Sequence, residues 1–187
     1  TQLPRHLTTF EYNGTEHFSD DHVALLPQQL TTLVLTKCTS ITDSGIEHLP
    51  RTLIHLFLDR SGNITDQGFL NLPSGLLSLR LLGCDTLTNA SAKALPRMIT
   101  SLFIKRTPGW GDEAAVHLPR LLTHLELPYF VKLTDDGFKR LPYLLHTLVL
   151  TRSRLLTPRI FQLIDSTCGP KKHDLDHDTV AQQMKDG

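Results

Sequence analysis

Leucines along this 187-residue chain follow an alternating pattern that returns at a fixed interval. Between Leu30 and Leu35 the apolar residues read L-x-x-L-x-L, and the alternation at its end is typical of a strand with one buried face. The same trio returns every 23 residues as far as Leu150, with isoleucine at 99 and 104. The dipeptide Leu-Pro keeps the same period and begins at residues 3, 26, 49, 72, 95, 118 and 141. A period of this length predicts a solenoid of stacked units.

A short helix is expected after each strand. Several units contain threonine followed by aspartate at this point, as in Thr42-Asp43 and Thr65-Asp66. Threonine is a favourable helix N-cap because its oxygen accepts hydrogen bonds from unpaired backbone N–H groups, and a carboxylate in the first turn interacts well with the helix dipole. The next Leu-Pro ends the helix, because proline lacks the amide N–H that the helix needs. Each unit therefore predicts one strand and one short helix.

The repeat resembles the leucine-rich repeat family over about residues 3–163. Cys38, followed by I-T-D-S-G-I at residues 41–46, is similar to the cysteine-containing subclass, which is frequent in substrate receptors of ubiquitin ligases. The Leu-Pro start is instead similar to the repeats of bacterial effectors, so the subfamily stays open. We predict an α/β leucine-rich-repeat solenoid, a curved right-handed coil with a parallel concave sheet and short convex helices.

Two regions are expected along the chain. Residues 1–169 are predicted to form the leucine-rich-repeat domain, with seven 23-residue repeats from Leu3 and a C-terminal capping helix near residues 158–168. Thr157-Pro158 favours the start of that helix. Residues 170–187 are charged and poor in apolar residues, which predicts a C-terminal tail. The first residue is not Met and lies just before a repeat boundary, so we expect a segment of a longer protein or a processed form.

The cysteines suit a structural role. Counted from the Leu of Leu-Pro, Cys38 and Cys84 occupy position 13, in the turn after the strand, where other repeats have small residues able to form hydrogen bonds. Three cysteines in the chain are too few for a disulfide framework, which favours the cytoplasm or another reducing compartment. Three glycosylation sequons, at Asn13, Asn63 and Asn89, leave secretion as the alternative.

No motif for catalysis or metal binding stands out. The chain has no phosphate-binding glycine-rich loop and no closely spaced cysteine pair of the zinc type. His55 and His124 share a strand position but lie three repeats apart. The segment from His173 to Asp178 has two histidines and an aspartate at every second residue, without the glycine and glutamate of a calcium loop. We predict no enzyme activity, no cofactor and no metal, and no apolar run is long enough to span a membrane.

The charge pattern changes this picture. The chain has 19 basic and 19 acidic residues, so its net charge is zero. Repeat positions 3 to 12 hold ten basic and three acidic residues, a net charge of +7. The rest of the repeats, through Leu163, carry six basic and eleven acidic residues, and the remaining residues three basic and five acidic. The sequence therefore predicts a basic concave side and an acidic convex side.

Position 9 of the repeat points outward from the predicted sheet and is apolar in four of seven units. Exposed apolar side chains with charged neighbours are typical of a binding surface. The alternative is that the basic residues only keep strand edges soluble. The predicted partner-binding residues are Val34, Phe57, Arg60, Arg80, Phe103, Lys105, Arg106, Glu126, Tyr129 and Arg152.

These features favour a non-catalytic domain for protein–protein recognition or scaffolding, which binds an acidic and partly apolar element of a partner. A substrate receptor of a ubiquitin ligase is the sharper form implied by the resemblance, with an F-box expected upstream of Thr1. The alternatives are a structural subunit of a larger assembly and nucleic-acid binding through the basic rims. A pI of about 7.1 disfavours nucleic acid, because domains that bind it are usually strongly basic.

Overall fold

Seven parallel strands form one sheet in sequence order in the computed structural model, which describes residues 3–14 and 18–160. The strands are β1 (Thr9–Asn13), β2 (Thr32–Thr36), β3 (His55–Leu58), β4 (Ser78–Leu82), β5 (Ser101–Lys105), β6 (His124–Glu126) and β7 (Thr147–Val149). Successive strands pair with a constant offset of 23 residues, so Leu33 lies opposite Leu56 and Leu79 opposite Leu102. The period of the sequence is thus the register of the sheet, and the predicted solenoid is confirmed.

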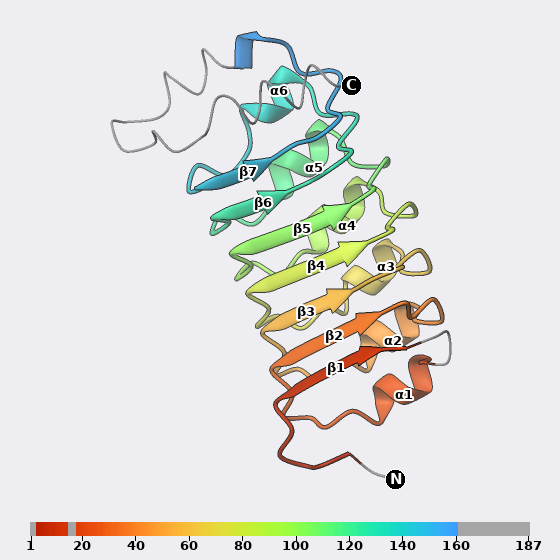
Figure 1. The fold of residues 1–187 in the computed structure, drawn as a ribbon. Coiled ribbons are helices and arrows are strands. Elements are labelled where there is room, and N and C mark those ends of the chain that lie inside the picture. The colour runs from red at the N-terminus through yellow and green to blue at the C-terminus, as the bar shows by residue number, and fades with distance from the viewer. Residues whose placement is uncertain (1–2, 15–17, 161–187) are drawn as a thin grey trace.

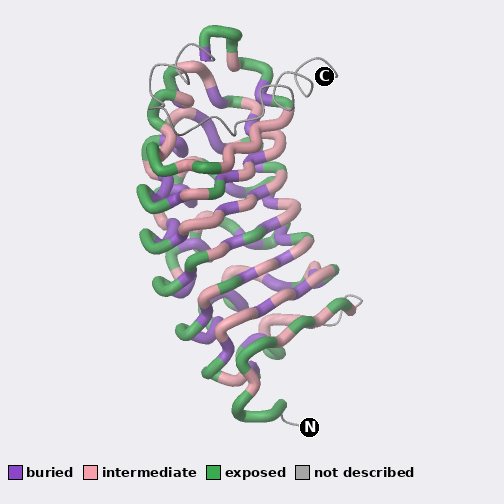
Figure 2. Tube along the Cα trace, turned by 60° about the vertical axis from the view of Figure 1, so that its left-hand side comes forward, coloured by how far each residue is buried: buried purple, intermediate pink, exposed green. Residues whose placement is uncertain are grey.

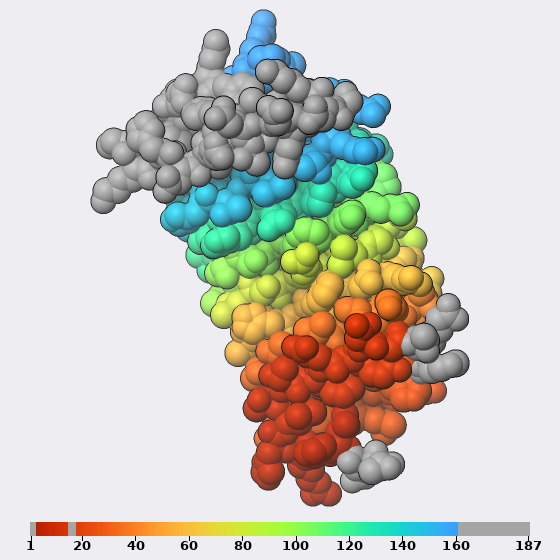
Figure 3. All heavy atoms as spheres, viewed as in Figure 1, coloured from red at the N-terminus to blue at the C-terminus, as the bar shows by residue number. Residues whose placement is uncertain are grey.

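Short helices follow the strands and cover one face of the sheet (Figure 1). They are α1 (Asp20–Ala24), α2 (Asp43–Glu47), α3 (Asp66–Phe69), α4 (Asn89–Ala94), α5 (Asp112–His117) and α6 (Asp135–Phe138). The opposite face of the sheet, toward the viewer in Figure 3, carries none of these helices. We name it the sheet face and define it by the outward side chains at repeat positions 7, 9 and 11. It corresponds to the side predicted to be concave.

The core lies between the strands and the helices. Along β2 to β6, inward side chains are buried and outward ones are partly or fully exposed, as the alternating colours of Figure 2 show. The leucine at position 8 is at most 2% exposed in the second to sixth coils, at Leu33, Leu56, Leu79, Leu102 and Leu125. The inward residues of the seventh coil are only partly buried, at Leu145, Leu148 and Leu150. Alternation in the sequence therefore predicted which strand residues pack inside.

Neighbouring coils are joined on the helix side by a carboxylate at position 18. Asp43 Oδ1 accepts a hydrogen bond from the backbone N–H of Thr65 at 2.8 Å, and Asp43 Oδ2 accepts one from its hydroxyl at 2.6 Å. The same bridge joins Asp20 to Thr42, Asp66 to Thr88, Asp112 to Thr134 and Asp135 to Thr157. The Thr65 hydroxyl also accepts from the N–H of Gln67, which confirms its N-cap role. The repeated Thr-Asp pair is therefore both a helix cap and a link between coils.

This bridge explains the glycine two residues after the aspartate. A Cβ atom added at Gly68 would collide with Oδ1 of Asp43 from the preceding coil, and one added at Gly137 would collide with Oδ1 of Asp112. Gly45 has the same environment. The motif T-D-x-G thus fits each coil against the carboxylate of the coil before it.

The link between the fourth and fifth coils has a different form. Asn89 replaces aspartate and Gly111 replaces threonine, so only the Gly111 N–H donates, to Asn89 Oδ1 at 2.9 Å. Trp110 is fully buried here and donates from Nε1 to Ser91 Oγ at 2.8 Å. The Trp110 ring also meets Phe130 edge-on at 6.5 Å between centroids. Aromatic packing therefore supplements the weaker bridge at this point.

The residues at position 13 form the predicted hydrogen bonds in some coils but not in others. Cys38 and Cys84 are buried, free thiols, and Cys38 and Ser61 donate to backbone carbonyls at 3.4 and 3.1 Å. The buried hydroxyls of Thr107 and Ser153 have no hydrogen-bond partner among the described residues. The hydrogen-bonding role predicted for this position is thus confirmed in some coils and wrong in these two.

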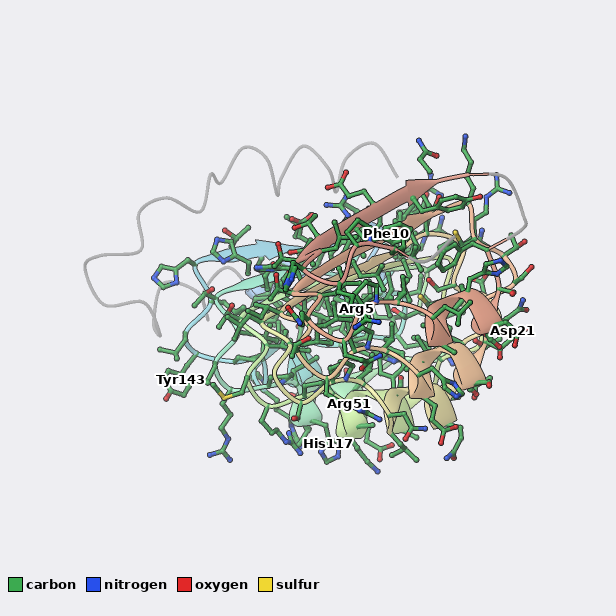
Figure 4. The ribbon with its side chains drawn as sticks, turned by 90° about the horizontal axis from the view of Figure 1, so that it is seen from below. Arg5, Phe10, Asp21, Arg51, His117 and Tyr143 are labelled. Carbon is green, nitrogen blue, oxygen red and sulfur yellow. The ribbon has the colours of Figure 1, made fainter. Side chains whose placement is uncertain are left out.

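The ends of the solenoid differ from its middle. In the first coil, aromatic residues take the place of leucine, and the Phe18 ring lies 5.9 Å from Phe10 and 5.1 Å from Tyr12 between centroids. Figure 4, which views this end, shows Phe10 beneath the first strand. The predicted capping helix near 158–168 and the predicted tail lie almost wholly outside the described residues; Arg159 and Ile160 are helical. None of the described helices has the length and apolar character needed to cross a bilayer.

Candidate functional site

A continuous row of side chains runs across the sheet face at position 9. The strand register places Phe57 beside Arg80, and Arg80 beside Phe103. Val34 extends the row at one end and Glu126 at the other. Five predicted binding residues from five separate repeats are therefore brought into one line by the sheet.

Arg80 is stacked between two phenylalanine rings. Its guanidinium carbon lies 4.2 Å from the Phe103 centroid and 5.4 Å from the Phe57 centroid. Each such contact at an exposed site contributes about 0.5–1 kcal/mol, and both limit the motion of a long side chain. Because stacking uses the faces of the guanidinium, its N–H groups stay available for planar recognition of a carboxylate. Arg80 is thus a preorganised cation between two apolar surfaces.

A second row follows the strands at position 12, and we name it the left-handed row. Its residues have positive φ, between 58° and 77°, at Lys37, Arg60, Gly83, Arg106, Tyr129 and Arg152. The N–H groups of Gly83, Arg106 and Tyr129 donate to the carbonyl at position 11 of the next coil, at 2.8–3.4 Å. This left-handed conformation turns the chain out of the strand while backbone hydrogen bonding between coils continues.

Long side chains at position 12 cost backbone energy. A residue with a Cβ atom in the left-handed region is less stable than glycine there by about 1 kcal/mol. Gly83 shows that glycine fits this turn, yet five coils keep lysine, arginine or tyrosine. The fold does not require these side chains, so their presence indicates a role other than stability.

Two of the arginines in this row are held in place. Arg106 binds Asp85 with two contacts, from Nε to Oδ1 at 3.1 Å and from a terminal nitrogen to Oδ2 at 2.9 Å. Arg152 lies over the Tyr129 ring, 4.9 Å from its centroid. Both interactions fix a cationic side chain along the edge of the sheet face.

Other cations here are open to a partner. Lys37 and Arg60 in the left-handed row, and Lys105 at position 11, form no salt bridge with any described residue. Together with Arg80 they place uncompensated positive charge beside Phe57 and Phe103. This combination suits an acidic ligand that also offers apolar groups.

The arginines at position 3 belong elsewhere. Arg51 donates to the carbonyls of Asn71 at 2.8 Å and Glu47 at 3.3 Å, and Arg97 donates to the carbonyl of His117 at 3.4 Å. Figure 4 shows Arg51 on the helix side of the molecule. Cations near the last carbonyls of a helix are stabilising, so these contacts stabilise the helix ends. Their assignment to the concave side was wrong. Positions 7 to 12 alone hold six basic and three acidic residues, so the net charge there is +3 rather than +7.

We next consider metal ligands and nucleophilic side chains among the described residues. Among the described residues, no group of three His, Cys, Asp or Glu side chains lies close enough to hold a metal ion. Burial, assisted by the charge of Asp85, raises the pKa of the Cys84 thiol to about 12, and burial also raises the pKa of Cys38. Both thiols therefore stay protonated at neutral pH, unlike nucleophilic cysteines, whose pKa is lowered.

All ten residues predicted for the site lie on the sheet face or along its left-handed row. Sequence reasoning missed the conformation of the row and the pairing of Asp85 with Arg106. It also left Lys37 out of the site. The glycine at position 12 of the fourth coil, Gly83, was the signal in the sequence for a left-handed turn.

The sheet, its 23-residue register and the short helices define this chain as an α/β leucine-rich-repeat solenoid. It is similar to a chain of the crystal structure of the Rad7 and Elc1 complex in yeast, with a TM-score of 0.62 and 20% identity over 86% of this chain and 47% of that chain. The leucine-rich repeat-containing protein LegL7 from Legionella pneumophila gives a TM-score of 0.49 and 18% identity, over 81% and 59% of the two chains. The chain thus spans about half the length of the Rad7–Elc1 chain it matches. No family model and no curated protein matches the sequence.

Proposed function

We propose that this domain is a non-catalytic recognition module that binds a protein partner on its sheet face and left-handed row. The observation that carries the proposal is the set of five long side chains at backbone positions where glycine is more stable. Binding of a partner explains why these long side chains are present at positions where glycine would give a more stable fold. The preorganised Arg80 stack supplies the centre of the same surface.

The partner that fits this face offers carboxylates next to apolar side chains. Carboxylates would pair with Arg80, Arg60 and Lys105, and apolar groups would pack against Phe57 and Phe103. Arginine and aromatic residues dominate the energetics of many interfaces. Nucleic acid fits less well, because the face has a net charge of only +3 and glutamates, Glu11 and Glu126, flank the central side chains of position 9 on both sides.

A sharper form of the proposal is a substrate receptor of a ubiquitin ligase. Two observations support it: the resemblance of the Cys38 repeat to the cysteine-containing subclass, and the structural likeness to a chain of a two-protein complex, Rad7 with Elc1. Copurification of ligase subunits with the protein from its native source tests this form. A captured partner without any ligase subunit would restrict the proposal to recognition alone.

We also propose a reducing compartment. Cys38 and Cys84 are buried free thiols, and the amide of Asn63 donates to a carbonyl of the preceding coil at 2.6 Å. Asn89 is occupied in the bridge between coils. Both uses compete with glycosylation of these two sequons. Mass spectrometry of the native protein is expected to find all three sequons unmodified, and a glycan on any of them would contradict this placement.

Capture from the native source tests the proposed function. The immobilised wild-type domain is expected to retain a partner that the Phe57→Ala and Phe103→Ala variants bind more weakly, by about 2 kcal/mol if the rings are hot spots. Leu70→Ala is the matched control, because Leu70 is 63% exposed at the end of α3 on the opposite side. Equal binding by wild type and both phenylalanine variants would remove the sheet face as the site.

A further inference from the structure

We propose that a second interaction surface lies on the turns leading into β5, β6 and β7, and that it binds an acidic amphipathic helix of a protein partner. These turns carry a residue pair at positions 3 and 4 of each coil: Arg97-Met98, Arg120-Leu121 and Tyr143-Leu144. We name this surface the turn ridge. It lies at the opposite ends of the strands from the left-handed row, and it does not depend on the function proposed for the sheet face.

Three apolar side chains line the turn ridge. Met98 is 50% exposed, Leu121 43% and Leu144 36%. The turns of the fifth and sixth coils are closed by equivalent hydrogen bonds, from Ile99 N to Pro96 O and from Leu122 N to Pro119 O. Because the strands that follow pair with the same 23-residue offset, these side chains lie side by side.

The turn itself does not require an apolar residue at position 4. In the first four coils the same position holds His6, Gln29, Thr52 and Gly75. Large apolar side chains occupy this position only from the fifth coil through the seventh. An exposed apolar line confined to adjacent coils is a feature of a binding surface rather than of the repeat.

The spacing of the turn ridge matches an α-helix. Neighbouring coils lie about 4.8 Å apart, so the three side chains span about 10 Å. Seven residues of an α-helix span about 10.5 Å, which places apolar side chains at i, i+4 and i+7 against three successive coils. An extended strand would present same-side residues about 6.8 Å apart and would lose this match.

Charge indicates the chemistry of the partner. Arg97 and Arg120 are exposed beside the apolar line, and residues 95–101, 118–124 and 141–147 contain no acidic side chain. Arg97 makes one 3.4 Å contact to a carbonyl, which leaves most of its N–H groups available. Tyr143, which is 75% exposed, projects from the edge of the molecule in Figure 4. A helix with acidic residues flanking its apolar stripe complements this surface.

Methionine NMR on the full chain tests the proposal. The chain has two methionines, so a labelled methyl group at Met98 reports on the turn ridge and one at Met184 reports on the C-terminal segment. The probe is a designed 18-residue helical peptide with leucines along one face and flanking glutamates. We expect saturable shifts at Met98 and binding at least ten-fold weaker to Leu121→Glu. The matched control Gln29→Glu, at the same position in the second coil, is expected to bind like wild type, and a lysine version of the peptide at least ten-fold more weakly.

Four results would overturn the proposal. The peptide leaves the Met98 signal unchanged, or it binds wild type and Leu121→Glu equally. The Met98 signal shifts with protein concentration alone, which would make a second copy of this chain the occupant. In the absence of peptide, Leu121→Glu shifts the Met184 signal, which would make the C-terminal segment of this chain the occupant.

Discussion

The carboxylate of Asp43 holds Thr65 of the next coil through two hydrogen bonds, 2.8 Å from its backbone nitrogen and 2.6 Å from its hydroxyl. The Thr65 hydroxyl in turn accepts from the N–H of Gln67, so the bridge between coils and the cap of α3 form one network. Helices of four to six residues are not stable alone. They persist here because hydrogen bonds hold their N-termini against the preceding coil.

Removal of one bridge is expected to destabilise the whole solenoid. Asp43→Ala leaves the N–H and hydroxyl of Thr65 without their acceptor, which costs about 1–3 kcal/mol of unfolding free energy. Glu47→Ala in the same helix is the control, because Glu47 is exposed, and it is expected to stay within about 0.5 kcal/mol. Urea unfolding of both variants measures the difference. Coinciding midpoints would mean that the bridge adds nothing to stability.

The bridge between Asp135 and Thr157 also predicts a dependence of stability on pH. Hydrogen bonds from the hydroxyl and then the backbone of Thr157 lower the pKa of Asp135. A carboxyl whose pKa is lowered on folding contributes stability above its unfolded pKa, and this contribution is lost as the pH falls through the folded pKa. Thr157→Val removes the larger of the two causes. Carboxyl NMR titration is expected to show a higher Asp135 pKa in the variant, together with a smaller loss of stability between neutral and acid pH. An unchanged pKa would rule out this role of the hydroxyl.

The two buried cysteines are expected to resist modification. Burial raises the pKa of Cys84 to about 12, so at pH 8 almost no reactive thiolate is present. In a Cys168→Ser background, a thiol reagent is expected to label Cys38 and Cys84 slowly in the folded protein and rapidly in urea. Fast labelling before unfolding would contradict their burial.

Much of the fold could be predicted because one period fixes it. A 23-residue repeat sets the register of every strand pair, and alternation within L-x-x-L-x-L identifies the inward side chains. The bridge between coils was missed because each aspartate acts on a threonine 22 residues ahead, in a different unit. The signal was present at one place: Asn89 replaces aspartate where Gly111 replaces threonine.

The position of the candidate site could be predicted from the sequence, but the backbone conformation at position 12 could not. Position 9 was identified because outward apolar residues at a fixed strand position are readable from the pattern. The left-handed conformation at position 12 was not, since lysine, arginine and tyrosine are not residues that favour it. The arginines at position 3 were misplaced because charge counted along the sequence does not reveal which carbonyl a long side chain reaches, as Arg51 does with Asn71.

The most direct test of the account combines stability and binding in one variant, Arg60→Gly. Arg60 has a φ of 63° and makes no salt bridge with a described residue, so glycine is expected to keep or raise the unfolding free energy, by up to about 1 kcal/mol. Gly83→Ala, the reverse change in the next coil, is expected to cost about 1 kcal/mol. If the left-handed row is kept for recognition, Arg60→Gly binds the captured partner at least ten-fold more weakly while folding as well as wild type. Undiminished binding by a variant that has lost stability would contradict the central claim.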